Sequence, residues 1–129
     1  MLVICLPTYN ERANLKCMVE TLEQTLKNVG RPSRVLVIDD GSPDGTGQIA
    51  QRLAAEHEWL DVLHRSGKRG LGPAYLAGFE HALSSGAELI VEIDCDFSHD
   101  PGDIARLLAA TEEADLVIGS RYVGGGGMH

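Results

Sequence analysis

The sequence predicts an α/β fold, an open and mostly parallel sheet with helices on both faces. Short, continuous apolar runs recur at 2–7, 34–40, 61–64, 88–94 and 115–119. Such runs are typical of parallel strands that are buried on both sides. Segments with apolar residues at helical spacing separate them. This β-α alternation predicts a sheet whose strands are joined by right-handed crossovers.

Each connecting segment carries one apolar stripe. The stripes consist of Leu15, Met18, Val19, Leu22 and Leu26; Ile49 and Leu53; Leu76, Phe79 and Leu83; and Ile104, Leu107 and Leu108. Residues three or four positions apart lie on the same side of a helix, so we expect each stripe to pack against the sheet.

Composition narrows the class of protein. The 129 residues suffice for one domain, and a net charge of −8 argues against a nucleic-acid partner, which requires a basic surface. The three cysteines lack C-x-x-C spacing, which argues against a disulfide framework and a zinc site and favours the cytoplasm. No basic, apolar leader opens the sequence and no apolar run approaches the roughly 20 residues of a membrane span.

Polar loops follow the predicted strands. They are "PTYNE", "DDGSPDGTG", "RSGKRGLG", "DCDFSHD" and "GSRYVGGGG". Ligands of open α/β sheets bind outside the carboxyl ends of the strands, where these loops converge. We therefore expect the functional site at this edge.

Asp94 and Asp96 follow the apolar run "LIVEI". In an extended chain, side chains two residues apart point to the same side, so both carboxylates can serve one divalent cation. Direct ligation by both requires a bend in the chain. Mg²⁺ and Mn²⁺ suit such a pair, because they take one or two carboxylates together with phosphate oxygens. The alternative is that Asp96 closes a loop while Asp94 faces solvent.

Two further loops combine functional and structural signals. Asp39 and Asp40 end the second predicted strand, where a carboxylate can accept hydrogen bonds from a ribose or a base. The following "SPDGTG" has turn chemistry, with Asp44 or Thr46 as a helix cap. In the first loop, Thr8-x-x-Glu11 fits a capping box.

Other loop residues have two open interpretations. Tyr9 either stacks on a base or packs against the protein, and Lys68 and Arg69 either meet a diphosphate or face solvent. Arg121 follows the fifth predicted strand, where its planar guanidinium suits a phosphate. His99 lies in the same loop as Asp96 and is a further candidate.

Together, "LPTYNERANL", "VLVIDDGSPDGTG", "GLGPAYLAGF", "IDCDFSHDP" and "DLVIGSRY" resemble the family-2 glycosyltransferases. The combination is most similar to the dolichol-phosphate or polyprenol-phosphate mannosyltransferases. The resemblance implies a GT-A, Rossmann-like fold in which residues 1–129 form the donor-binding domain. It also implies that the acceptor-side half of the family's domain is missing, because the motifs end shortly after "GSRY".

The resemblance assigns roles to individual residues. The residues expected around the guanosine are Pro7, Tyr9, Glu11, Val37 and Asp39. Asp94, Cys95 and Asp96 would form the D-x-D motif, with both aspartates as metal ligands and Asp96 as a catalytic residue. Ser98 would contact the diphosphate or the metal. Arg121 would act as a second catalytic residue beside the transferred sugar or the lipid phosphate.

The implied reaction moves mannose from GDP-mannose to a polyprenyl (dolichyl) phosphate with inversion, assisted by Mg²⁺ or Mn²⁺. A lipid acceptor implies peripheral contact with the cytoplasmic face of a membrane. The missing half implies either a homo-oligomer or a second chain that completes the site. Two alternatives stay open: another donor such as UDP-glucose, and a fragment that binds nucleotide-sugar without transferring it.

Overall fold

The computed structural model describes residues 1–66, 71–98 and 100–112 and shows a four-stranded parallel sheet. Its strands, in the order β3-β2-β1-β4, are β1 (Leu2–Thr8), β2 (Ser33–Asp39), β3 (Leu60–His64) and β4 (Leu89–Glu92). The predicted fold class is confirmed. The expected fifth strand, 115–119, lies outside the described residues.

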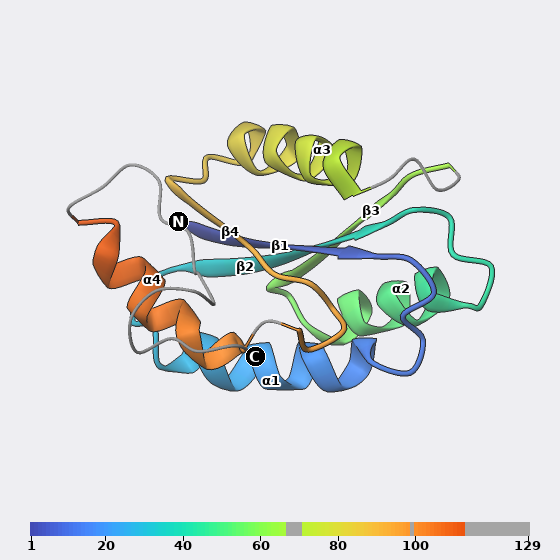
Figure 1. The fold of residues 1–129 in the computed structure, drawn as a ribbon, viewed down its shortest axis with the longest axis horizontal. Helices are drawn as coiled ribbons and strands as arrows, with labels where there is room; N and C mark the ends of the chain where they lie inside the picture. Colours follow the sequence, from blue (N-terminus) through green and yellow to red (C-terminus); the bar gives the residue numbers. More distant parts are fainter. Residues whose placement is uncertain (67–70, 99, 113–129) are drawn as a thin grey trace.

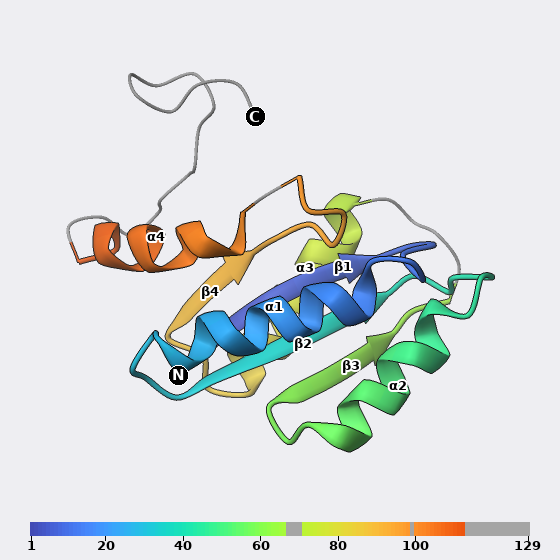
Figure 2. The same ribbon diagram turned by 90° about the horizontal axis from the view of Figure 1, so that it is seen from below.

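Helices cover both faces of this sheet (Figure 1). One face carries α1 (Leu15–Lys27), α2 (Thr46–Glu56) and α4 (Ile104–Ala110), the last preceded by a 3₁₀ turn at Pro101–Asp103. The other face carries α3 (Leu71–Ser84). Figure 2 shows α1 across the central strands, α2 beside β3 and α4 on the β4 side. Within the described ranges, no helix combines the length and apolar character needed to cross a membrane.

The side chains of β1 alternate between two cores. Leu2, Ile4 and Leu6 pack in the core beneath α1 and α2, whereas Val3 and Cys5 pack in the core beneath α3. Both faces of this strand are buried, and residues 2–7 are accordingly all apolar instead of alternating with polar residues. Each fully buried leucine or isoleucine stabilises the fold by about 1.5–3 kcal/mol.

The stripe predicted for α3 is wrong, although those predicted for α1, α2 and α4 supply buried residues. Leu76 and Leu83 are 61% and 64% exposed, and the face against the sheet carries Ala74, Gly78 and Ala82 instead. A Cβ atom at Gly78 would lie 2.9 Å from Cδ1 of Ile38. Small residues four apart therefore allow α3 to approach the sheet closely, which an apolar stripe of large residues would prevent.

Candidate functional site

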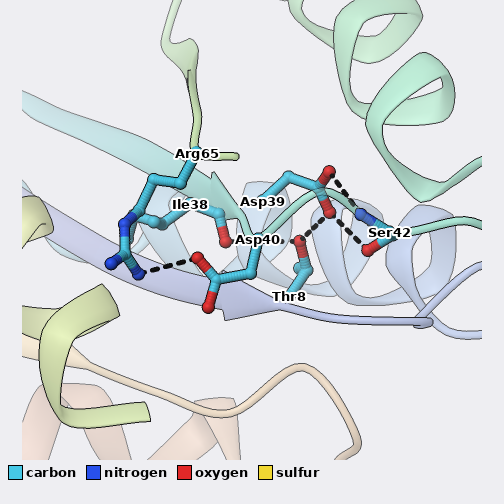
Figure 3. Close-up of polar contacts among 6 residues, drawn as sticks. All are labelled: Thr8, Ile38, Asp39, Asp40, Ser42 and Arg65. Atoms are coloured by element: carbon cyan, nitrogen blue, oxygen red, sulfur yellow. Dashed lines mark hydrogen bonds and ion pairs between the residues drawn. The ribbon is translucent and has the colours of Figure 1, made fainter. Parts of the chain in front are cut away.

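Asp39, at the carboxyl end of β2, is a buried junction between two loops. Its carboxylate accepts hydrogen bonds from the Thr8 hydroxyl at 3.0 Å, the Ser42 hydroxyl at 2.6 Å and the Ser42 amide at 3.2 Å (Figure 3). The residue is only 3% exposed, and a Cβ atom at Gly47 would lie 2.9 Å from Asp39 Oδ2. A carboxylate offers about four acceptor positions. Three of those of Asp39 accept hydrogen bonds from Thr8 and Ser42, and one position is left.

Asp40 turns to a different partner. Its Oδ1 atom lies 2.7 Å from Nη1 of Arg65, and both side chains are largely buried (Figure 3). The Arg65 amide also donates to the Asp39 carbonyl at 2.8 Å, which joins the ends of β2 and β3. Sequence reasoning missed Arg65. The available signal was a basic residue directly after one parallel strand and an acidic residue directly after its neighbour.

Side chains of the β2–α2 loop hold the β1–α1 loop through its backbone. The amides of Asn10, Glu11 and Arg12 donate in turn to Ser42 Oγ at 3.0 Å, Thr46 Oγ1 at 3.0 Å and Asp44 Oδ2 at 3.2 Å. Three consecutive N–H groups are thus satisfied by one neighbouring loop. The "SPDGTG" segment is indeed structural, and what it fixes is the loop that carries Tyr9 and Glu11.

The predicted capping box at Thr8-x-x-Glu11 is wrong. Thr8 belongs to β1 and bonds Asp39, and α1 begins only at Leu15 with Asn14 as its N-cap. Glu11 instead accepts a hydrogen bond from Asn14 Nδ2 at 3.0 Å. The spacing matched a box, but the strand extends to Thr8 and a loop of several residues separates it from the helix.

The caps expected for α2 are also corrected. Its N-cap is Gly45, whose φ of 96° lies in the left-handed region that favours glycine. Asp44 precedes the cap and accepts hydrogen bonds from the amide and hydroxyl of Thr46. The bond from Thr46 lowers the pKa of Asp44 below its ordinary value, so the loop is held by a charged carboxylate.

The residues expected around a nucleoside fall into two groups. Tyr9 and Glu11 are partly exposed in the β1–α1 loop. Pro7 and Val37 are buried inside strands, with the Val37 side chain in the core beneath α1. The first pair and Asp39 thus lie at the predicted edge, whereas Val37 and Pro7 support that edge from below.

The D-x-D segment lies just beyond β4, which ends at Glu92 and not, as expected, at position 94. The Ile93 amide still donates to the Cys5 carbonyl at 3.1 Å, after which the chain turns at Cys95 and Asp96. Phe97 has a φ of 63°, an unusual left-handed value for a bulky residue. The chain therefore bends at the motif instead of continuing as an extended strand.

Cys95 separates the two aspartates and points into the core. Burial, followed by the charges of Glu11, Asp96 and Asp94, raises the pKa of its thiol to about 12. A neutral thiol in the core is a poor metal ligand, because metals bind thiolate.

The two aspartates have different partners. Asp94 Oδ1 accepts a hydrogen bond from the Tyr75 hydroxyl at 2.8 Å, and Asp96 Oδ1 accepts one from the Ser98 amide at 2.9 Å. Asp96 therefore closes its loop, as the alternative interpretation expected, but Asp94 is half-buried against α3 and does not simply face solvent. Sequence reasoning did not single out Tyr75.

The carboxylates of Asp94 and Asp96 suit a hard divalent cation that takes some of its ligands from the protein and the others from a substrate. Of the residues the structure describes, no three His, Cys, Asp or Glu form a metal-holding group. Mg²⁺ and Mn²⁺ do not need such a group, since they bind through one or two carboxylates, substrate phosphates and water. Asp94 and Asp96 fit this use. Lys68, Arg69, His99 and Arg121 lie outside the described residues.

Comparison with known proteins places this geometry in a family. The sequence profile of glycosyl transferase family 2 matches residues 3–129. The chain belongs to this family. The parallel sheet and the acidic segment beyond β4 therefore lie within a family-2 domain.

Two curated relatives cover almost the whole chain. The polyprenol monophosphomannose synthase of Mycolicibacterium smegmatis is 49% identical over 96% of this chain and 46% of its own length. The undecaprenyl-phosphate mannosyltransferase of Micrococcus luteus is 50% identical over 95% of this chain and 49% of its own length. This family-2 chain thus spans about half the length of both relatives.

A solved structure shares the fold. The mannosyltransferase of Pyrobaculum calidifontis, in complex with GDP-Man and Mn²⁺, superposes with a TM-score of 0.64 and 26% identity. The match covers 74% of this chain and 27% of that one. The sheet described above therefore matches one part of the longer Pyrobaculum protein.

Proposed function

We propose that this chain is the donor-binding part of a mannosyltransferase that moves mannose from GDP-mannose to a polyprenyl phosphate with inversion. The observation that carries the proposal is the similarity, near 50% over almost the whole chain, to two proteins named as polyprenyl-phosphate mannosyltransferases. The acidic motif beside a firmly held loop supports it. The Pyrobaculum enzyme, solved with GDP-Man and Mn²⁺, supports the donor and the metal.

The nucleoside would lie against the β1–α1 loop. Tyr9 offers a ring for base stacking, and Glu11 and the remaining acceptor position of Asp39 offer oxygens to base N–H or ribose O–H groups. The backbone bonds from Asn10, Glu11 and Arg12 hold this loop before ligand arrives, which lowers the entropy cost of binding. Pro7 and Val37 act beneath the site by fixing the strands that carry it.

Asp94 and Asp96 would hold Mg²⁺ or Mn²⁺ together with the donor diphosphate, and Ser98 lies close enough in sequence to contact the same group. When bound, the cation offsets negative charge on the GDP leaving group. Cys95 anchors the segment in the core and leaves the two carboxylates at the edge.

The acceptor needs no general base. A polyprenyl phosphate is already an anion near neutral pH, so its oxygen can attack the sugar without losing a proton first. Arg121 is proposed to meet this phosphate or the transferred sugar. The remaining acceptor contacts are proposed to come from residues beyond those of this chain or from a second copy, and the lipid implies peripheral contact with a membrane.

Transfer is tested by incubating the chain with GDP-mannose carrying a radiolabel in the mannose, undecaprenyl phosphate in detergent, and Mn²⁺. If a second copy of the chain completes the acceptor site, label should enter the organic phase, and Asp96→Ala should abolish it. Donor binding without any labelled lipid would exclude completion of the site by a second copy and would restrict this chain to donor binding. Label transferred from UDP-glucose and not from GDP-mannose would replace the donor.

A further inference from the structure

Tyr75 reaches the D-x-D segment from the opposite face of the sheet to α1. It lies on α3, and its hydroxyl donates to Asp94 Oδ1 at 2.8 Å. Figure 1 shows α3 on one side of the sheet with β4 beneath it, and α1 on the other side. The first aspartate of the motif is therefore held by an element distant from its own loop.

The close approach of α3 makes this contact possible. Gly78 follows Tyr75 by one helical turn, and a Cβ atom there would lie 2.9 Å from Ile38 Cδ1 and 3.3 Å from Cys5 Sγ. The Tyr75 ring is half-buried and stacks at a centroid distance of 6.4 Å on Phe79. Packing against the sheet holds α3 in place, and packing against Phe79 holds the Tyr75 ring, independently of the hydrogen bond to Asp94.

The tyrosine acts as the donor of this bond. The phenol O–H is the donor and the carboxylate oxygen is the acceptor. A charge-assisted bond of this kind is stronger than a neutral one.

Burial of the two neighbouring side chains also fixes the backbone on either side of Asp94. Ile93 and Cys95 are both buried in the core on the α1 face, so the Asp94 side chain is directed toward α3. With the backbone fixed, rotation about the side-chain bonds is the freedom that Tyr75 restricts. A ligand carboxylate whose orientation is set by a second group binds its metal more tightly than one that must be ordered by the metal.

We propose that Tyr75 is a positioning residue for the metal-binding pair, holding the Asp94 carboxylate in the orientation that accepts the divalent cation bound with the donor. This inference rests on the proposed function, because it assumes that Asp94 meets a metal. It assigns to α3 a part in metal binding that lies outside the D-x-D motif itself.

The test is a calorimetric titration with GDP-mannose at a series of Mn²⁺ concentrations. Tyr75→Phe removes only the hydroxyl, and the Mn²⁺ concentration that gives half of the maximal affinity gain should rise about tenfold. Affinity for GDP in the presence of a chelator should stay at the wild-type value, which also shows that the variant is folded. Ser85→Ala removes a hydroxyl that bonds the His81 carbonyl at the far end of α3 and should change neither quantity.

A double variant tests whether Tyr75 affects the Mn²⁺ dependence through Asp94 or by another route. Asp94→Ala retains Asp96, and adding Tyr75→Phe to it should cause no further change in Mn²⁺ dependence. An unchanged Mn²⁺ requirement in Tyr75→Phe overturns the inference while the proposed function stands, as does a full additional loss in the Asp94→Ala background. If the wild-type chain binds no GDP-mannose at any Mn²⁺ concentration, the proposed function fails and the role of Tyr75 fails with it.

Discussion

The Asp40 carboxylate and the Arg65 guanidinium lie 2.7 Å apart at the edge that carries the proposed donor site, with 7% and 14% of their side chains exposed. This pair joins the ends of β2 and β3 directly behind Asp39. A cation at the edge of the proposed donor site suggests a phosphate ligand, but the Arg65 guanidinium is already paired with the Asp40 carboxylate. Its role is to hold the edge together.

Removing one partner of this pair should destabilise the fold strongly. Arg65→Met leaves Asp40 buried without a counter-charge, which should lower the free energy of unfolding by about 3–5 kcal/mol. Chemical denaturation monitored by circular dichroism measures the change. Arg34→Met is the matched control, because its ion pair with Asp61 is far more exposed and should contribute at most about 1 kcal/mol. Equal losses in the two variants would show that burial does not set the strength of the Arg65 pair.

The hydrogen bonds between the β1–α1 and β2–α2 loops should matter for donor binding. Asp44→Ala removes the acceptor of the Arg12 amide and the partner of Thr46, so the loop bearing Tyr9 and Glu11 loses part of its support. We expect the affinity for GDP to fall about tenfold, since one or two hydrogen bonds of about 1 kcal/mol then fail to hold the loop.

Asp44→Asn serves as the control for this change. The amide oxygen can still accept one of these bonds, so about half of the lost binding free energy should return. Equal affinity for GDP in wild type and Asp44→Ala would mean that the loop is ordered without its neighbour.

Gly78 should be intolerant of any side chain. A Cβ atom there meets Ile38 at 2.9 Å, so Gly78→Ala should cost about 1–3 kcal/mol of stability despite the better helix propensity of alanine. Gly72 lies on the same helix, and a Cβ atom there would meet no other atom within 4 Å, so Gly72→Ala should be neutral or slightly stabilising. Thermal unfolding distinguishes the two. A neutral Gly78→Ala would contradict the close approach of α3.

The cysteines should differ sharply in reactivity. Burial raises the pKa of the Cys5 and Cys95 thiols to about 12, whereas Cys17 is exposed. Iodoacetamide at pH 8 should therefore label Cys17 in the native chain, and all three cysteines after denaturation, as read by mass spectrometry of tryptic peptides. Native labelling of Cys95 as fast as Cys17 would show that the D-x-D segment opens readily.

Continuous apolar runs predicted the parallel strands, and helical spacing predicted α1, because both signals follow directly from burial. The same logic failed for α3. Its buried face consists of alanine and glycine, which a search for large apolar residues overlooks, and two large leucines lie on the outside. Close packing of small residues depends on the neighbouring strand, and spacing within the helix does not reveal it.

The position of the site was predictable in part. Strand ends predicted that Asp39, Asp94 and Asp96 would lie near the carboxyl edge of the sheet, where polar loops of parallel strands converge. The partners of these residues were not identified. Tyr75 lies 19 positions before Asp94, and Arg65 lies 25 positions after Asp40. Such pairs are brought together by the packing of separate elements, and neither leaves a local pattern in the sequence.

The most direct test of the donor-site account is calorimetric titration of this chain with GDP-mannose and with UDP-glucose, each with Mn²⁺ and with a chelator, alongside Asp96→Ala. GDP-mannose should bind, Mn²⁺ should strengthen the binding, and Asp96→Ala should remove the effect of Mn²⁺. Binding of UDP-glucose in preference to GDP-mannose would contradict the mannosyl assignment. Absence of binding to both nucleotide-sugars by the folded chain would contradict the donor site itself.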